Sequence, residues 1–180
     1  MTNSNTNIGI EEKDRKTKLD KYSISEQLSD IQEKTNLSSI KIGDILFRYR
    51  DIILRGLYEG ISFRFGYIAT IKTSVDNSES NVVEPLARTA RRISDSTNIP
   101  FYSVFGVLKA YIELAEVNLR KGKSFNIVGI LKLKPVVLDD GTVGNITVDI
   151  SRSVNSSSCK LPHRVRAGVL SNFRYLVSNA

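Results

Sequence analysis

Cationic side chains are the most distinctive chemical feature of this chain, and they gather in its second half. Residues 81–180 hold fourteen Lys and Arg against seven Asp and Glu, whereas residues 23–80 hold seven against eight. The acid-free stretch from Ser151 to the end contains five cations, which are Arg152, Lys160, Arg164, Arg166 and Arg174. A basic surface attracts polyanions such as nucleic acid through long-range, salt-screened fields. The alternative is a basic composition that only aids solubility.

Two smaller groups of cations could also contact phosphate. Arg88, Arg91 and Arg92 crowd one short predicted helix. The alternative for them is a solvated helix face or ion pairs with Glu84 and Asp95.

Lys132 and Lys134 alternate along a predicted strand, so they share one face that could meet a phosphate backbone or simply water. The strongest candidate for polyanion binding is a cluster near the C-terminus with no acid nearby in sequence. Its members are Lys160, His163, Arg164 and Arg166.

The residues that catalysis or metal binding would need are scarce. His163 is the only histidine and Cys159 the only cysteine, whereas a structural zinc site needs about four ligands. We find no arrangement of a nucleophile with a base and no glycine-rich phosphate loop. The sequence therefore predicts a protein that is not an enzyme, with no metal, no cofactor and no small-molecule substrate.

Cysteine use and hydropathy also bear on location. A lone cysteine allows no intrachain disulfide, which favours a reducing compartment. The N-terminus has no apolar signal segment, and the apolar runs are too short to span a bilayer. We expect a protein of a virion or a host cytoplasm, not secreted through a signal peptide and without a membrane partner.

An internal repeat organises the chain. Residues 93–134 align without a gap on residues 31–72, at an offset of 62 positions and with eleven identities. The identical pairs include Tyr49 with Tyr111 and Gly60 with Gly122. Such self-similarity indicates two copies of one supersecondary unit. Because each copy alone is near the size at which a core becomes marginal, we expect the two to share one core.

Each copy reads as two helices, a glycine stop and a β-hairpin, which gives an α+β fold. The predicted division is a polar tail over 1–22, a first unit over 23–80 without a terminal helix, and a second unit over 81–180. The second unit is expected to carry a short β-arm and a C-terminal helix over 166–177.

The long helix of each copy carries an apolar stripe, and we expect the two stripes to form the shared core. Tyr49 and Tyr111 belong to these stripes, which favours core packing over a role in stacking on bases. The predicted core consists of Ile45, Leu46, Tyr49, Ile53, Leu57, Val104, Leu108, Tyr111, Ala115 and Leu119.

This order of elements resembles the HU and integration host factor family of bacterial-type architectural DNA-binding proteins. Three stretches of the second copy carry the resemblance: Thr97 to Ile99 as the helix–helix turn, Leu119 to Gly129 as the helix end and strand, and Arg166 to Leu170 as the start of a terminal helix. The resemblance covers roughly 84–177, with a degenerate copy at 23–72. It implies an intrachain pseudo-dimer of two HU-like units.

Family members kink DNA with long basic β-arms tipped by a proline that wedges between base pairs. Here the matching stretch, Val136–Ser151, has no Lys or Arg and turns at Asp139, Asp140 and Gly141. The matching stretch of the first copy, Thr73–Val82, has two acids and no cation. Because acids repel phosphate, we do not expect the minor-groove clamp to operate.

Three functions are compatible with these features. The first is a structural component of a larger assembly, such as a phage virion or nucleoprotein complex, in which trimmed HU-like units pack against other structural proteins or further copies of the chain. The alternative is a free, sequence-nonspecific protein that binds and bends double-stranded DNA with its basic second half. A sequence-specific transcription regulator ranks last because no recognition element is apparent.

Overall fold

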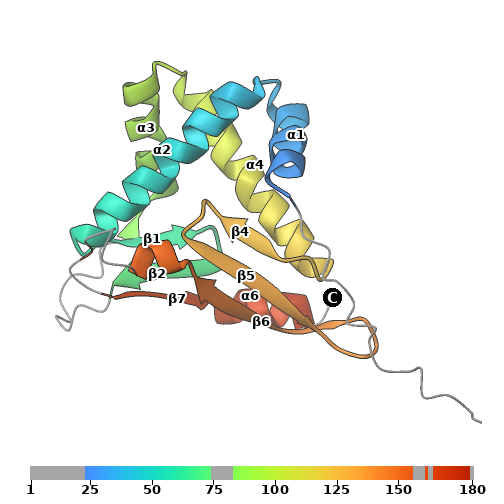
Figure 1. The fold of residues 1–180 in the computed structure, drawn as a ribbon. Coiled ribbons are helices and arrows are strands. Elements are labelled where there is room, and N and C mark those ends of the chain that lie inside the picture. The colour runs from blue at the N-terminus through green and yellow to red at the C-terminus, as the bar shows by residue number, and fades with distance from the viewer. Residues whose placement is uncertain (1–22, 74–82, 156–160, 162–163, 179–180) are drawn as a thin grey trace, which may run out of the picture.

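A computed structural model describes residues 23–73, 83–155, 161 and 164–178 of the chain. It confirms the α+β class. The first four helices of the chain lie in a layer above two small sheets (Figure 1). The predicted tail over 1–22 and the two acids of the first copy's arm stretch, Asp76 and Glu79, lie outside the described residues.

The four helices of the upper layer recur at the interval of the sequence repeat. Helices α1 (Ile24–Thr35) and α3 (Leu86–Thr97) each have 12 residues, and their first residues are 62 positions apart. Helices α2 (Ser39–Tyr58) and α4 (Phe101–Arg120) each have 20 residues and the same offset. Helix α1 lies against both α2 and α4, and α3 lies against both α4 and α2.

Local signals fix the ends of these helices. Ser23 caps α1 in a capping box with Glu26, which satisfies two backbone donors at the helix start. Asn36 and Asn98 adopt the left-handed conformation at the C-caps of α1 and α3, with φ of 55° and 56°. These asparagines are equivalent in the repeat, so the same turn chemistry ends both short helices.

The first sheet has the strand order β3-β1-β2-β7. Strands β1 (Ser62–Phe65) and β2 (Ala69–Thr73) form the predicted hairpin of the first copy. Strand β3 (Val83–Glu84) pairs parallel to β1. Glu84 is extended because Pro85 follows it, and a proline pushes the preceding residue towards extended backbone.

The second sheet has the order β4-β5-β6. Strands β4 (Phe125–Ile127) and β5 (Leu131–Val137) form the hairpin of the second copy, and β6 (Val143–Ile150) pairs antiparallel to β5. The β5–β6 hairpin is the predicted arm. A short helix, α5 (Arg152–Asn155), follows it.

The C-terminal segment differs from the prediction. The sequence predicted one helix over 166–177, whereas Val165–Val169 is strand β7 and only Ser171–Ser178, α6, is helical. The buried and exposed side chains of β7 alternate, as a half-buried strand requires. Glycine at 168 and the valines that end this strand are weak helix formers, which explains the error.

The partner of this segment was also unexpected. Strand β7 pairs antiparallel with β2 of the first copy, from Ala69 opposite Val169 to Thr73 opposite Val165. The sequence had assigned the terminal helix to the second copy and none to the first. In the structure, the last strand of the chain closes the sheet that the first hairpin begins.

The buried face of both sheets and the inner faces of the helices form one apolar core. Nine of the ten predicted core positions are buried, and Leu46 is half-buried at the edge of the core. Phe65 and Phe125, from the two sheets, both contact the ring of Tyr111 at centroid distances of 5.6 and 5.2 Å. These aromatic contacts join the two sheets through α4.

Candidate nucleic-acid interface

The open face of the first sheet carries three cations. Neighbouring residues of a strand point to opposite faces, so Phe63 and Phe65 point to the core while Arg64 between them is exposed. On the adjacent strand Lys72 is exposed, and it lies directly opposite Arg166 of β7. Arg64, Lys72 and Arg166 therefore share the face that points away from the core.

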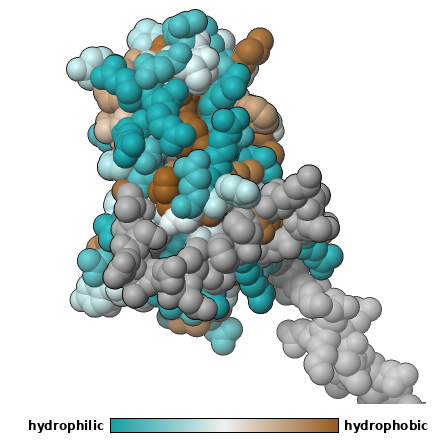
Figure 2. All heavy atoms as spheres, turned by 90° about the vertical axis from the view of Figure 1, so that its left-hand side faces the viewer, coloured by the Kyte–Doolittle hydropathy of each residue, from teal (hydrophilic) through white to brown (hydrophobic). Residues whose placement is uncertain are grey.

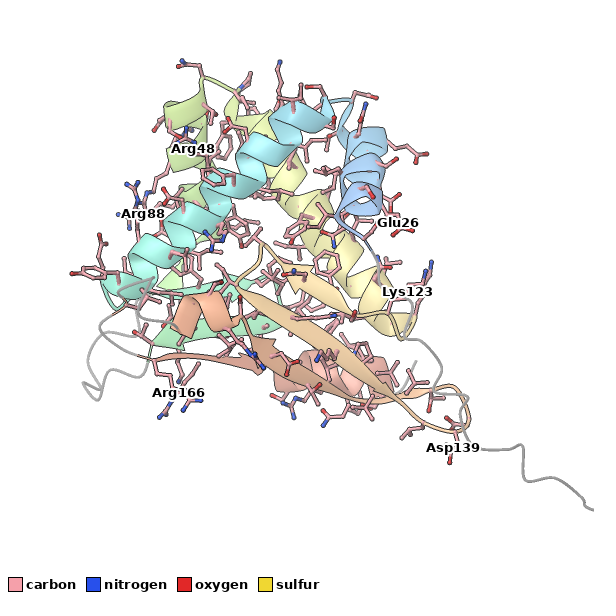
Figure 3. The ribbon with its side chains drawn as sticks, in the orientation of Figure 1. Glu26, Arg48, Arg88, Lys123, Asp139 and Arg166 are labelled. Carbon is pink, nitrogen blue, oxygen red and sulfur yellow. The ribbon has the colours of Figure 1, made fainter. Side chains whose placement is uncertain are left out.

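Among the described residues, no neighbouring acid neutralises these three cations. No ion pair joins Arg64, Lys72 or Arg166 to any carboxylate in the described part of the chain. Figure 3 shows Arg166 projecting from the sheet, away from the helical layer that carries Arg48 and Arg88. The face is thus able to attract an anionic partner from the side opposite the helices.

Three more predicted candidates are exposed cations of the C-terminal elements. Arg164 immediately precedes β7, Arg174 lies on α6 and Arg152 opens α5. Strand β7 belongs to the first sheet and also lies beside β6, which α6 contacts. Two further candidates, Lys160 and His163, lie outside the described residues.

The matching face of the second sheet is less basic. Lys134 forms an ion pair with Asp149 across the β5–β6 ladder, and Lys132 lies directly opposite the same aspartate. Asp149 therefore offsets part of the charge of both lysines. Of the two sheets, the first presents the stronger attraction for a polyanion.

The arginines of α3 serve mainly to satisfy a buried acid. The side chain of Glu84 is only 2% exposed, and its Oε1 lies 3.8 Å from Arg88 Nε and 3.5 Å from Arg92 Nη1. Arg91 stacks over the ring of Phe101, with its guanidinium carbon 4.5 Å from the centroid. Arg88 and Arg92 thus pair with Glu84, as the ion-pair alternative expected, whereas the partner of Arg91 is an aromatic ring.

Arg64 and Lys72 were missed as candidates by the sequence reasoning. Alternation within the first hairpin could have placed both on its polar face, and Lys72 is one of the eleven repeated identities. The pairing that sets Lys72 opposite Arg166 joins residues 94 positions apart, and the sequence pattern gave no signal for it.

The tip of the β5–β6 arm is acidic and apolar. Asp139 and Asp140 are exposed, and Asp140 Oδ1 accepts hydrogen bonds from the backbone and hydroxyl of Thr142 at 2.9 and 2.6 Å. These bonds lower the pKa of Asp140, so its negative charge persists in mildly acidic solution. Val136, Val137 and Leu138, just before the turn, are each 43–50% exposed.

Tyr49 and Tyr111 belong to the core and present no ring to solvent. The hydroxyl of Tyr111 donates to Asn126 O at 2.7 Å and accepts from Val128 N at 2.9 Å, which fixes the β4–β5 turn. Burial raises the pKa of both phenols above the ordinary value. Neither ring is available for stacking on a base.

The described residues contain no group of three or more His, Cys, Asp or Glu side chains arranged to hold a metal ion. None of their helices combines the length and apolar character needed to cross a membrane.

No family model, curated protein or solved structure matches this chain.

Proposed function

We propose that this chain is a non-enzymatic, HU-like architectural protein that packs into a larger nucleoprotein assembly, such as a phage particle. In that assembly it contacts double-stranded DNA through the open face of its first sheet. The observation that carries the DNA contact is the set of Arg64, Lys72 and Arg166, three exposed cations on one face without an acidic partner among the described residues. Cations that neutralise phosphates release counterions and so favour binding.

The presence of two copies of one unit is supported by the equal helix lengths and by their constant offset, which is that of the sequence repeat. We interpret the two copies as the halves of a pseudo-dimer within one polypeptide. The C-terminal segment fits this interpretation when it is counted with the first unit. Leu170 N donates to Ile68 O at 2.9 Å, and Ser151 N donates to Ile130 O at 2.8 Å. The two acceptors, Ile68 and Ile130, are again equivalent in the repeat.

Under this interpretation β7 and α6 are the third strand and terminal helix of the first unit, whereas β6 and α5 play these roles in the second. The first unit then consists of residues 24–73 and 165–178. The second unit is inserted where the first would carry its arm. The described residues contain one arm, and its tip bears Asp139 and Asp140 instead of cations.

A single acidic arm disfavours the DNA clamp of the HU family, so we expect binding along the sheet without a strong kink. The exposed Val136, Val137 and Leu138 suit this arm for contact with protein instead of DNA. This observation favours the assembly role. A component that contacts only protein is the second candidate function.

Titration of a random duplex with the purified protein tests the DNA contact. We expect a mobility shift at about 50 mM salt and a steep loss of affinity as salt rises. Replacing Lys72 and Arg166 by alanine should reduce the slope of log affinity against log salt by about 0.9 for each phosphate that is no longer neutralised.

The control variant removes the same charge elsewhere. Lys41 and Lys109 are exposed on the helical layer, and their double replacement by alanine should leave the salt slope close to that of the unchanged protein. No shift at about 50 mM salt, or equal losses in the two double variants, would refute binding through the first sheet. Masses measured in solution with and without duplex separate the two candidate functions, because a component that contacts only protein gains no mass from the DNA.

A further inference from the structure

Helix α2 carries a second apolar stripe on its solvent side. Ile40, Phe47 and Tyr58 are 83%, 62% and 60% exposed, and Leu54 between them is half-buried. At 100° per residue, these four positions fall within about 40° of one another around the helix. The core side of α2, which includes Ile45 and Tyr49, lies on the opposite face. Figure 2 shows hydrophobic residues among hydrophilic ones on the helical part of the side that it presents.

The fold itself does not require this stripe. The equivalent positions of α4 in the repeat are Tyr102, Lys109, Glu116 and Arg120. Three of these four are charged, and they form ion pairs along α4. Two helices of equal length and matching position thus have different outer faces, and only that of α2 is apolar along its length. An exposed apolar stripe of this kind is typical of an interaction surface.

The charges beside the stripe identify the partner. They alternate in sign along α2 in the order Asp44, Arg48, Asp51 and Arg55, and within the chain they pair as Asp44 with Arg48 and Asp51 with Arg55, at 3.7 and 3.0 Å. When the series is taken from Arg55 back to Asp44, each position has the opposite charge to that in the forward direction. A second copy of α2 packed antiparallel would therefore set Asp44 opposite Arg55 and Arg48 opposite Asp51.

The apolar residues follow the same symmetry. The antiparallel register that pairs these charges also brings Ile40 of one copy near Tyr58 of the other, and Phe47 near Leu54. A two-fold axis requires such self-complementarity, since each contact then occurs twice. We propose that two copies of this chain associate through the outer faces of their α2 helices, packed antiparallel about a two-fold axis.

Solution mass measured without nucleic acid tests the proposal, at concentrations spanning about two orders of magnitude around 10 μM. We expect the mass to double as concentration rises, and Phe47→Glu to hold the chain as a monomer. Lys109→Glu, at the equivalent position of α4, should leave the dimer intact. A chain that stays monomeric throughout, or equal effects of the two variants, would overturn the proposal. Because DNA is absent, the outcome is separate from that of the duplex titration.

A charge exchange tests the antiparallel geometry and does not depend on the folding of Phe47→Glu. Arg48→Asp places like charges opposite each other twice in the dimer, so it should weaken association by about tenfold or more. Adding Asp51→Arg restores opposite signs at every facing position and should restore the dimer. If the double variant associates no better than Arg48→Asp alone, the antiparallel packing of α2 is refuted.

Discussion

Truncating Phe173 to alanine should destabilise the first sheet more than the second. Phe173 lies on α6 near the C-terminus, is completely buried, and its ring centroid lies 5.8 Å from that of Tyr67 in the β1–β2 turn. Replacing a buried phenylalanine by alanine costs about 3–5 kcal/mol in lost burial and cavity formation. Because the free energy of unfolding of small proteins is about 5–15 kcal/mol, Phe173→Ala should remain folded but with low stability.

Urea unfolding followed by far-ultraviolet circular dichroism measures this loss. With a slope of about 2 kcal/mol per molar urea, the midpoint should fall by roughly 2 M. Tyr175→Ala provides the control, because it removes an aromatic ring from the same helix at a position that is 70% exposed. We expect the free energy of unfolding of the control to change by less than about 1 kcal/mol.

Hydrogen exchange tests where the loss occurs. Strand β7 and α6 close the first sheet, so in Phe173→Ala the amides of β2 should lose protection before those of β5. A loss of stability below about 1 kcal/mol would refute the buried position of this ring. Uniform loss of protection across both sheets would refute the assignment of the C-terminal segment to the first sheet.

Three other predictions concern the core and the buried acid. Burial raises the pKa of Tyr49 and Tyr111, so above a pH of about 10 they ionise first in the unfolded chain. The contribution of these two residues to stability should be constant below that pH and fall above it by about 1.4 kcal/mol per pH unit for each tyrosine. Urea melts of the unchanged protein and of Tyr111→Phe would measure this fall. Gly66→Ala should lower the free energy of unfolding by about 1–3 kcal/mol, because φ is +54° and the added Cβ would lie 2.6 Å from Ile112 Cγ2; thermal melts showing no loss would contradict the strain. Glu84→Gln should cost about 1–3 kcal/mol by leaving a buried group poorly paired with its two arginines on α3, and an unchanged urea midpoint would show that those ion pairs contribute nothing.

The sequence predicted the helices well because their signals are local. Ser23 and Ser38 cap α1 and α2, and Gly60 and Gly122 adopt positive φ just after the two long helices. Such caps depend on residues within one turn, so composition and spacing reveal them. Because the two copies align without a gap, the helices assigned in one copy were also assigned at the equivalent residues of the other.

Prediction from the sequence failed where the structure depends on pairing between strands that are distant in the chain. The segment after Arg164 has helix-like spacing of apolar residues, but its first part is a strand because β2 offers it an edge. That pairing joins residues about a hundred positions apart, and no local rule reports it. The candidate interface shares this limit, since Arg166 was found from its charge whereas Lys72 became a candidate only through its position opposite Arg166.

The pairing of β7 with β2 also sets an order of events during synthesis. The ribosome releases β1 and β2 long before it makes Val165–Val169, so one edge of that hairpin waits with unpaired backbone donors and acceptors while the whole second copy is added. An open strand edge recruits other chains, and nascent polypeptides are prone to this error. A transcript cut short before codon 165 would therefore yield a product that aggregates through the open edge of β2, even though β1 and β2 are complete.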